Sequence, residues 1–307
     1  MFVMVRVQLY RILATSRPKF LMLTVSCLCL AFATIIAENI AINYLHLVLI
    51  FIGALSAHVS VNMFNEYLDF TSGLDLHTQR TPFSGGSGTL PMTPKLAKPV
   101  QMAAICTFLI TLLIGLYLIG VSDWGLLPIG LLGLVLIYFY TTKITHWPLL
   151  CLIAPGLAFG PLMISGAYYV LIGQYSVAVF CISLIVFFLV NNLLLLNQFP
   201  DLEADRNAGR CHLPILIGRQ KSAWVYVGFL ASTYVLILLN VSLSFLPPAS
   251  LLGLLSFPLA FHAAKIAIRH ANELDKLKPA LALNVIITLA TPVLVAIGII
   301  WQHLLQN

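Results

Sequence analysis

The segment VAVFCISLIVFFLVNNLLLLNQFPDLEAD, residues 177–205, decides the fold of this chain. Residues 177–196 carry no charged side chain, and about 20 apolar residues are enough for a helix to cross the hydrocarbon core of a bilayer. Three acids follow within five residues, at Asp201, Glu203 and Asp205. The segment therefore predicts a membrane-spanning helix that runs into an acidic cluster.

The rest of the chain has a similar composition. Of 307 residues, 60% are apolar and 8% are charged, whereas roughly 25% are charged in a soluble domain. These values exclude a soluble globular enzyme, a disordered chain and a disulfide-stapled secreted module. The cysteines show no metal-ligand spacing. The net charge of +6 comes without a basic patch or an aromatic-rich binding motif, so we expect no nucleic acid among the partners.

Continuous apolar runs predict nine membrane-spanning helices. They lie near residues 20–37, 41–64, 100–120, 125–140, 149–171, 175–197, 222–245, 249–268 and 279–301. The alternation expected of a lipid-facing β-barrel is missing. We therefore expect an all-α integral membrane protein, a bundle of nine transmembrane helices, preceded by an N-terminal interfacial segment at residues 1–19.

The positive charges are segregated among the predicted connections. With nine spans, all sixteen lysines and arginines fall on one side of the membrane. The positive-inside rule then places the N-terminus and these connections in the cytoplasm. We expect a multi-pass protein of a bacterial or archaeal cytoplasmic membrane. A cleaved signal peptide within residues 1–37 is the alternative, and it would leave eight spans.

The first acidic stretch, residues 65–75, reads NEYLDFTSGLD. Asn65 and Asp69 are four residues apart and therefore share one face of a helix. Asn62 and His58 continue this face into the apolar run, so the face is expected to line a wet cavity. Asp75 would lie on another face of a continuous helix, but Gly73 offers a break that brings it back.

The second stretch, residues 197–205, repeats this arrangement. Asn197, Asp201 and Asp205 lie at positions i, i+4 and i+8, again on one helix face. Glu203 points elsewhere, and Pro200 predicts a break or kink near Asn197. The two Asn-x-x-x-Asp units are 132 residues apart, and each follows a long apolar run that ends at a cytoplasmic connection.

Carboxylate and amide oxygens without cysteine or histidine suit Mg²⁺, which prefers few carboxylates together with substrate phosphate oxygens. Two such clusters that face each other would hold a diphosphate between two metal ions. The expected metal ligands are Asn65, Asp69, Asp75, Asn197, Asp201 and Asp205. Nearby bases would bind the phosphates directly; these are Arg80, Lys143, Arg206 and Arg210. The alternative is that the acids are ordinary interfacial residues paired with exposed bases.

These motifs resemble the UbiA superfamily of membrane prenyltransferases, and most closely its MenA-like branch. The resemblance rests on the stretch at 65–75, on NQFPDLEADRNAGR at 197–210 and on FGPLMISGAYYV at 159–170. Two positions depart from the branch. Pro200 stands where the branch usually has arginine, and Tyr140-x-x-Lys143 is closer to the 4-hydroxybenzoate branch.

The resemblance implies a prenyltransferase domain over residues 20–307, with the helices around a central cavity. The implied reaction moves a polyprenyl group from polyprenyl diphosphate to an aromatic acceptor, with Mg²⁺ as cofactor and membrane lipid around the tail. The expected acceptor is 1,4-dihydroxy-2-naphthoate of menaquinone biosynthesis, with 4-hydroxybenzoate or another aromatic or lipid acceptor as the alternative. A cation-coupled transporter is the alternative from a different class.

The residues expected to act in this reaction form two groups. The catalytic group is Asp69, Asp201, Lys143 and Tyr140. The group facing the acceptor or cavity is His58, Asn62 and Tyr67, and Tyr140, Tyr67 and His58 are candidates for the base that takes the ring proton. The glycine-rich stretch 84–88 is expected to close over the phosphates as a lid.

Overall fold

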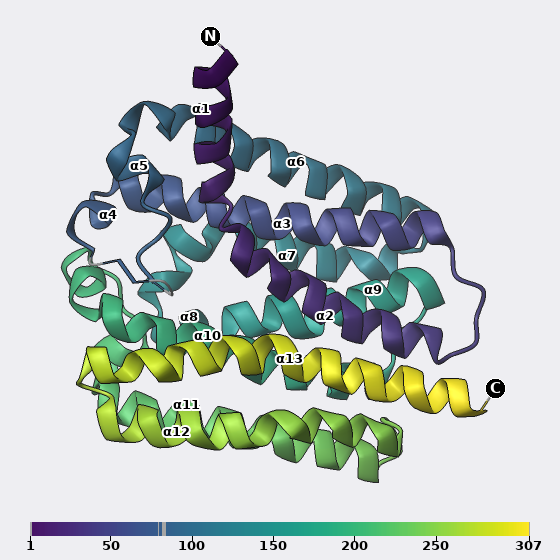
Figure 1. Cartoon of the computed structure of the whole chain (residues 1–307). Helices are drawn as coiled ribbons and strands as arrows, with labels where there is room; N and C mark the ends of the chain where they lie inside the picture. The colour runs from purple at the N-terminus through teal and green to yellow at the C-terminus, as the bar shows by residue number, and fades with distance from the viewer. Residues whose placement is uncertain (1, 79, 82–83, 307) are drawn as a thin grey trace.

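The computed structural model describes residues 2–78, 80, 81 and 84–306, and its described part contains helices and no strand (Figure 1). The α-helices are α1 Phe2–Thr15, α2 Pro18–Ile36, α3 Tyr44–Thr71, α4 Leu74–His77, α5 Thr89–Met92, α6 Ala97–Val121, α7 Leu127–Thr142, α8 Pro148–Leu157, α9 Met163–Ile172, α10 Val177–Asn207, α11 Leu213–Ser242, α12 Phe257–His270 and α13 Leu274–Gln306. Short 3-10 segments connect them, and the π-helical segment η4, Ala158–Leu162, joins α8 to α9.

The predicted nine spans are confirmed. Within the described residues, nine helical stretches are long and apolar enough to cross a membrane, and each overlaps a predicted run. The fifth, Pro148–Ile172, combines α8, η4 and α9, and the eighth, Pro248–His270, begins as a 3-10 helix. The protein is an integral, multi-pass membrane protein.

The helix break predicted as one outcome at Pro200 does not occur, because α10 continues to Asn207. Membrane helices tolerate proline when neighbouring groups satisfy the freed backbone. Phe199 and Leu202 on either side are buried and hold the helix in place, and Arg219 Nε donates to the Phe199 carbonyl at 2.9 Å. The second acidic stretch therefore lies on a helix rather than in a loop.

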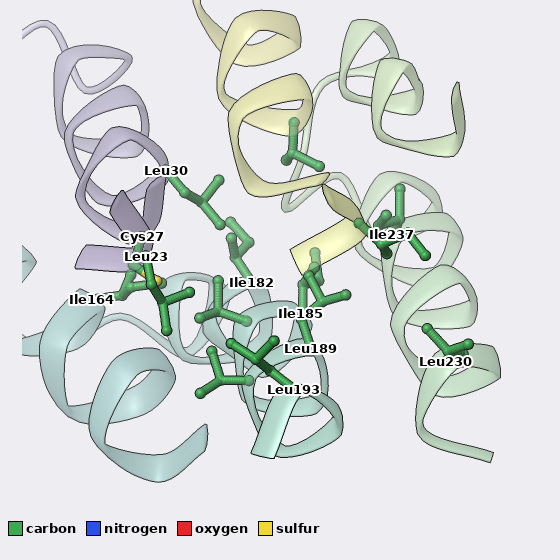
Figure 2. Packing of buried hydrophobic residues seen from close by; sticks show 14 of the residues in the cluster. Leu23, Cys27, Leu30, Ile164, Ile182, Ile185, Leu189, Leu193, Leu230 and Ile237 are labelled. Atoms are coloured by element: carbon green, nitrogen blue, oxygen red, sulfur yellow. The ribbon is translucent and has the colours of Figure 1, made fainter. Parts of the chain in front are cut away.

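The core of the bundle is built around α10 (Figure 2). Ile182, Ile185 and Leu189 on this helix are fully buried. They face side chains of α2, such as Leu30, and of α11, such as Ile237, in one continuous cluster. Because lipid tails are as apolar as these residues, close packing holds the helices together more than exclusion from water does.

Two glycines allow α8 and η4 to approach α10 closely. A Cβ atom at Gly156 would clash with the Phe187 carbonyl oxygen, and one at Gly160 would lie 2.6 Å from the Ser183 carbonyl oxygen. Asn191 Oδ1 accepts a hydrogen bond from Gly156 N at 2.6 Å. Small residues four apart at a membrane helix crossing have this function in general.

The ends of the helices that carry the two acidic stretches lie at the same end of the bundle, on the left in Figure 1. The C-terminus lies at the opposite end. The helix α1 lies outside the bundle, where Arg11 donates to Thr93 Oγ1 at 2.6 Å just beyond α5. This arrangement brings residues far apart in sequence to one mouth.

Candidate active site

A cavity of about 660 Å³ opens among α3, α6, α7, α9 and α10. One end of its wall is polar and the other is apolar. The polar end includes Arg17, Asn65, Asp69, Asp75, Asn197, Asp201, Asp205, Arg210 and His212. The apolar arm includes Ile50, Ile114, Leu118, Leu134, Phe159 and Met163. Such a cavity fits a molecule with a charged head and a long apolar tail.

The first acidic stretch contributes three side chains to the polar end. Asn65 and Asp69 lie on one face of the last turns of α3, as the spacing predicts. The helix ends at Thr71, and Gly73 adopts a φ of 82°, a left-handed conformation that glycine takes without strain. The chain then turns into α4, and Asp75 returns to the cavity wall as predicted.

The second stretch faces the first across the cavity mouth. Asn197, Asp201 and Asp205 line the wall from α10. Arg210 contacts both stretches: its guanidinium forms an ion pair with Asp69 and another, at 2.9 Å, with Asp205. Burial acts against the charge of this arginine, but the two carboxylates more than offset it and raise the pKa of Arg210.

Two further residues at the mouth, His212 and Arg17, are not among the site residues predicted from the sequence. His212 is buried and its Nε2 lies 3.0 Å from Asp205 Oδ2. Arg17 was assigned to the interfacial segment, yet it lines the cavity and pairs with Glu66 at 2.8 Å. Arg17 has a φ of 53° and precedes Pro18, the first residue of α2. This turn between α1 and α2, which the sequence signals only by the proline, leaves the Arg17 side chain on the cavity wall.

Oxygen atoms at the mouth fit a hard divalent cation. Asp75 Oδ2, Asn197 Oδ1 and Asp201 Oδ1 are buried and have no hydrogen-bond partner within the described residues. An unpaired buried oxygen costs free energy unless a ligand satisfies it. Carboxylate and amide oxygens of this kind, with phosphate oxygens to complete the shell, are typical of Mg²⁺ sites.

The electrostatics at Asp75 also indicate a site that attracts cations. Burial, and then the negative charges of Asp69 and Glu66, raise the pKa of Asp75 to about 7, although Arg17 and Arg80 act in the opposite direction. A carboxyl group with its pKa near neutrality holds a proton that a metal ion can displace.

The glycine-rich stretch lies across this mouth. Ser84, Gly85 and Gly86 line the cavity. The Ser84 hydroxyl and the Gly85 backbone N–H donate hydrogen bonds to the Asp201 carboxylate. The glycine-rich stretch, which follows the first acidic stretch in sequence, is therefore hydrogen-bonded to the second acidic stretch. Pro82 and Phe83, which precede this stretch, lie outside the described residues.

Three other predicted residues line the cavity. His58 Nδ1 lies 2.8 Å from Thr24 Oγ1, and its ring packs edge-on against Phe159. Asn62 is on the wall and donates to the Ser16 carbonyl at 2.9 Å. Tyr140 also lines the cavity, beside Cys151, to which it is hydrogen-bonded. These residues stand between the polar mouth and the apolar arm.

The structure places four predicted residues away from the cavity wall. Tyr67 is two positions from Asn65 and so points to another side of α3, where it packs in the cluster around Met63. Lys143 is exposed after the end of α7. Arg206 is one position from Asp205, outside the polar face, and pairs with exposed Glu203 at 3.1 Å. Arg80 is exposed, and its guanidinium lies against Gly88.

Curated proteins of known name resemble the chain over most of its length. It is 28% identical over 210 residues to 1,4-dihydroxy-2-naphthoate octaprenyltransferase of Bacillus subtilis, a match that covers 67% of this chain and 66% of that protein. It is 27% identical over 223 residues to UbiA prenyltransferase domain-containing protein 1 of Homo sapiens, with 68% and 61% covered. The matches thus span slightly less than two thirds of these relatives' length.

Solved structures show the same fold. A UbiA homologue from Aeropyrum pernix K1 matches with a TM-score of 0.67 at 17% identity, over 91% of this chain and 97% of that one. A UbiA homologue from Archaeoglobus fulgidus, bound to GPP and Mg²⁺, matches with a TM-score of 0.59 at 15% identity, over 93% and 99%. Residues 24–288 match the UbiA prenyltransferase family itself. The chain belongs to the UbiA prenyltransferase family.

Proposed function

We propose that the protein transfers a polyprenyl group from polyprenyl diphosphate to an aromatic acceptor, with Mg²⁺ as cofactor. The observation that carries this proposal is the convergence of two acidic helix ends on the mouth of one cavity whose far end is apolar. The mouth suits a diphosphate with its metal ions, and the apolar arm suits a prenyl tail. The relative from Archaeoglobus fulgidus is bound to GPP and Mg²⁺, which supports a prenyl diphosphate as the substrate and Mg²⁺ as the cofactor.

The metal ions would be held by Asn65, Asp69, Asp75, Asn197, Asp201 and Asp205. When bound, they supply positive charge to the diphosphate as it departs. Arg210 and Arg17 line the same mouth and would hold the phosphate oxygens through their planar guanidinium groups. Together these residues favour breakage of the allylic C–O bond, with both electrons leaving on the diphosphate.

The allylic carbon then forms a bond with an electron-rich ring carbon of the acceptor. The ring regains its aromaticity by losing a proton to a base, or by losing carbon dioxide. The apolar wall around Phe159 and Leu134 keeps water away from the reactive carbon until the acceptor reaches it. His58 and Tyr140, which also line the cavity, would contact the acceptor.

The proposed acceptor is 1,4-dihydroxy-2-naphthoate, which would place the protein in menaquinone biosynthesis. The name of the Bacillus subtilis relative supports this choice. We also propose that the cavity mouth faces the cytoplasm, because all sixteen lysines and arginines lie on the connections of that side or toward the helix ends that adjoin them.

The test uses the purified protein in detergent or lipid with geranyl diphosphate or a longer homologue. We expect a prenylated product and released pyrophosphate with 1,4-dihydroxy-2-naphthoate, and no product when EDTA removes Mg²⁺. Parallel reactions with 4-hydroxybenzoate and homogentisate test the acceptor. Equal rates with all three would contradict the assignment of 1,4-dihydroxy-2-naphthoate, and transfer to none of them would contradict the reaction itself.

A further inference from the structure

Glu66 is an acid of the first motif that does not face the cavity. It is fully buried and lies behind the polar wall, next to Asn65 in sequence but about 100° around α3. A buried carboxylate is costly unless charges and hydrogen bonds compensate it. The contacts of Glu66 therefore indicate what it does.

Both oxygens of Glu66 accept hydrogen bonds from other parts of the chain. Oε1 accepts from Arg17 Nε at 2.9 Å and from Ser87 N at 2.6 Å, and Oε2 accepts from Ser87 Oγ at 2.7 Å. Hydrogen bonds to a charged group are the stronger kind. These contacts direct the Glu66 carboxylate to Arg17 and Ser87, and Glu66 is not among the residues that line the cavity.

The contacts on Ser87 connect Glu66 to the second motif. Ser87 is three residues from Ser84, which with Gly85 donates hydrogen bonds to Asp201. Between them, Gly86 has a φ of 70°, and a Cβ atom there would come within 3.0 Å of Glu66 Oε1 and 3.4 Å of Asp75 Oδ1. The backbone of Ser84–Ser87 is thus tightly seated on the acids of both motifs.

Arg17 connects the same carboxylate to the N-terminal segment. Its guanidinium reaches Glu66 and, at 3.0 Å, the side-chain oxygen of Asn65. The preceding residue, Ser16, accepts a hydrogen bond from Asn62 through its carbonyl oxygen. The turn between α1 and α2 is therefore held against the same face of α3 that forms the polar wall.

We propose that Glu66 is a positioning residue that seats Ser84–Ser87 across the cavity mouth and thereby holds Asp201 and Asp75 in place for the diphosphate. Arg17 is its partner and keeps the buried charge satisfied. This inference rests on the proposed function for its kinetic consequence, but not for the loop closure itself. Glu66 acts through the segment and does not bind metal or substrate.

The experiment compares Glu66→Gln with wild type. Glutamine has nearly the same shape, but its amide nitrogen cannot accept a hydrogen bond from Ser87 and it carries no charge for Arg17. We expect the KM for prenyl diphosphate to rise about tenfold, with kcat changed less than about twofold. We also expect faster trypsin cleavage after the exposed residue Arg80, because the segment that follows is no longer held.

A second variant guards against misfolding of the first. Ser87→Ala removes only the hydroxyl donor, so we expect the same two changes at a smaller amplitude. Glu203→Gln is the matched control, because Glu203 is an exposed acid of the second stretch, 66% exposed and paired with Arg206. It should leave both the KM and the cleavage rate at wild-type values.

Two results would overturn the proposal. One is wild-type KM and wild-type cleavage in both Glu66→Gln and Ser87→Ala. The other is a large loss of kcat in Glu66→Gln with unchanged cleavage, which would indicate that Glu66 binds the metal directly. Cleavage is measured without substrate, so loop closure is tested even if the protein transfers no prenyl group in the parallel assay.

Discussion

At the scale of single residues, the cavity mouth holds more negative than positive charge. Four carboxylates, from Asp69, Asp75, Asp201 and Asp205, share the wall with two guanidinium groups, Arg17 and Arg210. A diphosphate adds further negative charge. The mouth therefore needs divalent cations to accept it, which agrees with the unpaired oxygens described above.

The first prediction concerns one acid from each motif. Asp69→Asn or Asp201→Asn should lower prenyl transfer about 100-fold or more, because each removes an anionic metal ligand without changing the size of the side chain. Pyrophosphate release measures the rate. Asp275→Asn is the control, because its carboxylate is 93% exposed and far along the chain from the motifs. Full activity in either cavity variant would refute the metal assignment.

The second prediction concerns pH. Because the pKa of Asp75 is raised to about 7, protons compete with Mg²⁺ below that pH, and the apparent Mg²⁺ affinity should fall as the pH drops from 8 to 6. Titration of the activity with Mg²⁺ at each pH measures this. Asp75→Asn should lower the apparent Mg²⁺ affinity at pH 8 and make this affinity less dependent on pH. If the affinity of this variant depends on pH as strongly as that of the wild type, Asp75 is not the group that titrates.

The same raised pKa has an opposite consequence for the stability of the metal-free protein. The folded state binds the Asp75 proton more tightly than the unfolded chain does, because the ordinary pKa of an aspartate carboxyl group is 3.8. Protonation of Asp75 therefore contributes stability that is fully present below that ordinary value and is lost as the pH rises through about 7.

The third prediction separates the two arginines that follow the second motif. Arg210 bridges Asp69 and Asp205, whereas Arg206 pairs with exposed Glu203. Arg210→Gln should raise the KM for prenyl diphosphate about tenfold or more, and Arg206→Gln should change it less than about twofold. Steady-state kinetics measure both. Equal effects would favour the assignment from sequence, in which both arginines bind the phosphates.

At the scale of helices, sequence patterns predicted which residues share a face of the same helix. Spacing placed Asn65 with Asp69, and Asn197 with Asp201 and Asp205, because a helical period is a local property. The same reasoning could not place Arg17, Glu66 or His212. Their positions depend on which turn folds back against which helix, and that is decided by packing across the whole bundle. Pro200 shows the same limit, because α10 continues through it to Asn207 with buried residues on either side.

The fourth prediction tests a helix contact. Gly160→Ala should destabilise the protein by about 1–3 kcal/mol, because the added methyl group meets the Ser183 carbonyl where α10 passes. Gly120→Ala on α6 adds the same group in open space, so we expect stability to be unchanged or higher by about 0.5–1 kcal/mol. Thermal unfolding in detergent compares the two, and a matching loss in both variants would argue against this contact.

At the scale of the whole molecule, the charge distribution agrees with an odd number of spans. Each of the nine spans in the described chain overlaps a predicted run, so the connections alternate as the charges require. The fifth prediction is one of topology. Alkaline phosphatase fused after Glu273 should be inactive in a bacterial host, and a fusion after Gln306 should be active. The reverse pattern would contradict the proposed orientation.

The shape of the cavity, polar at the helix ends and apolar along its depth, has a consequence for how the protein meets its substrate. A polyprenyl chain is nearly insoluble in water, and the prenylated product, which lacks the charged diphosphate, is less soluble than the substrate. A binding site whose two ends match the two phases of a bilayer never has to extract that chain from the lipid. Encounter and release then become diffusion in two dimensions, and the composition and fluidity of the surrounding membrane set the pace at which substrate arrives.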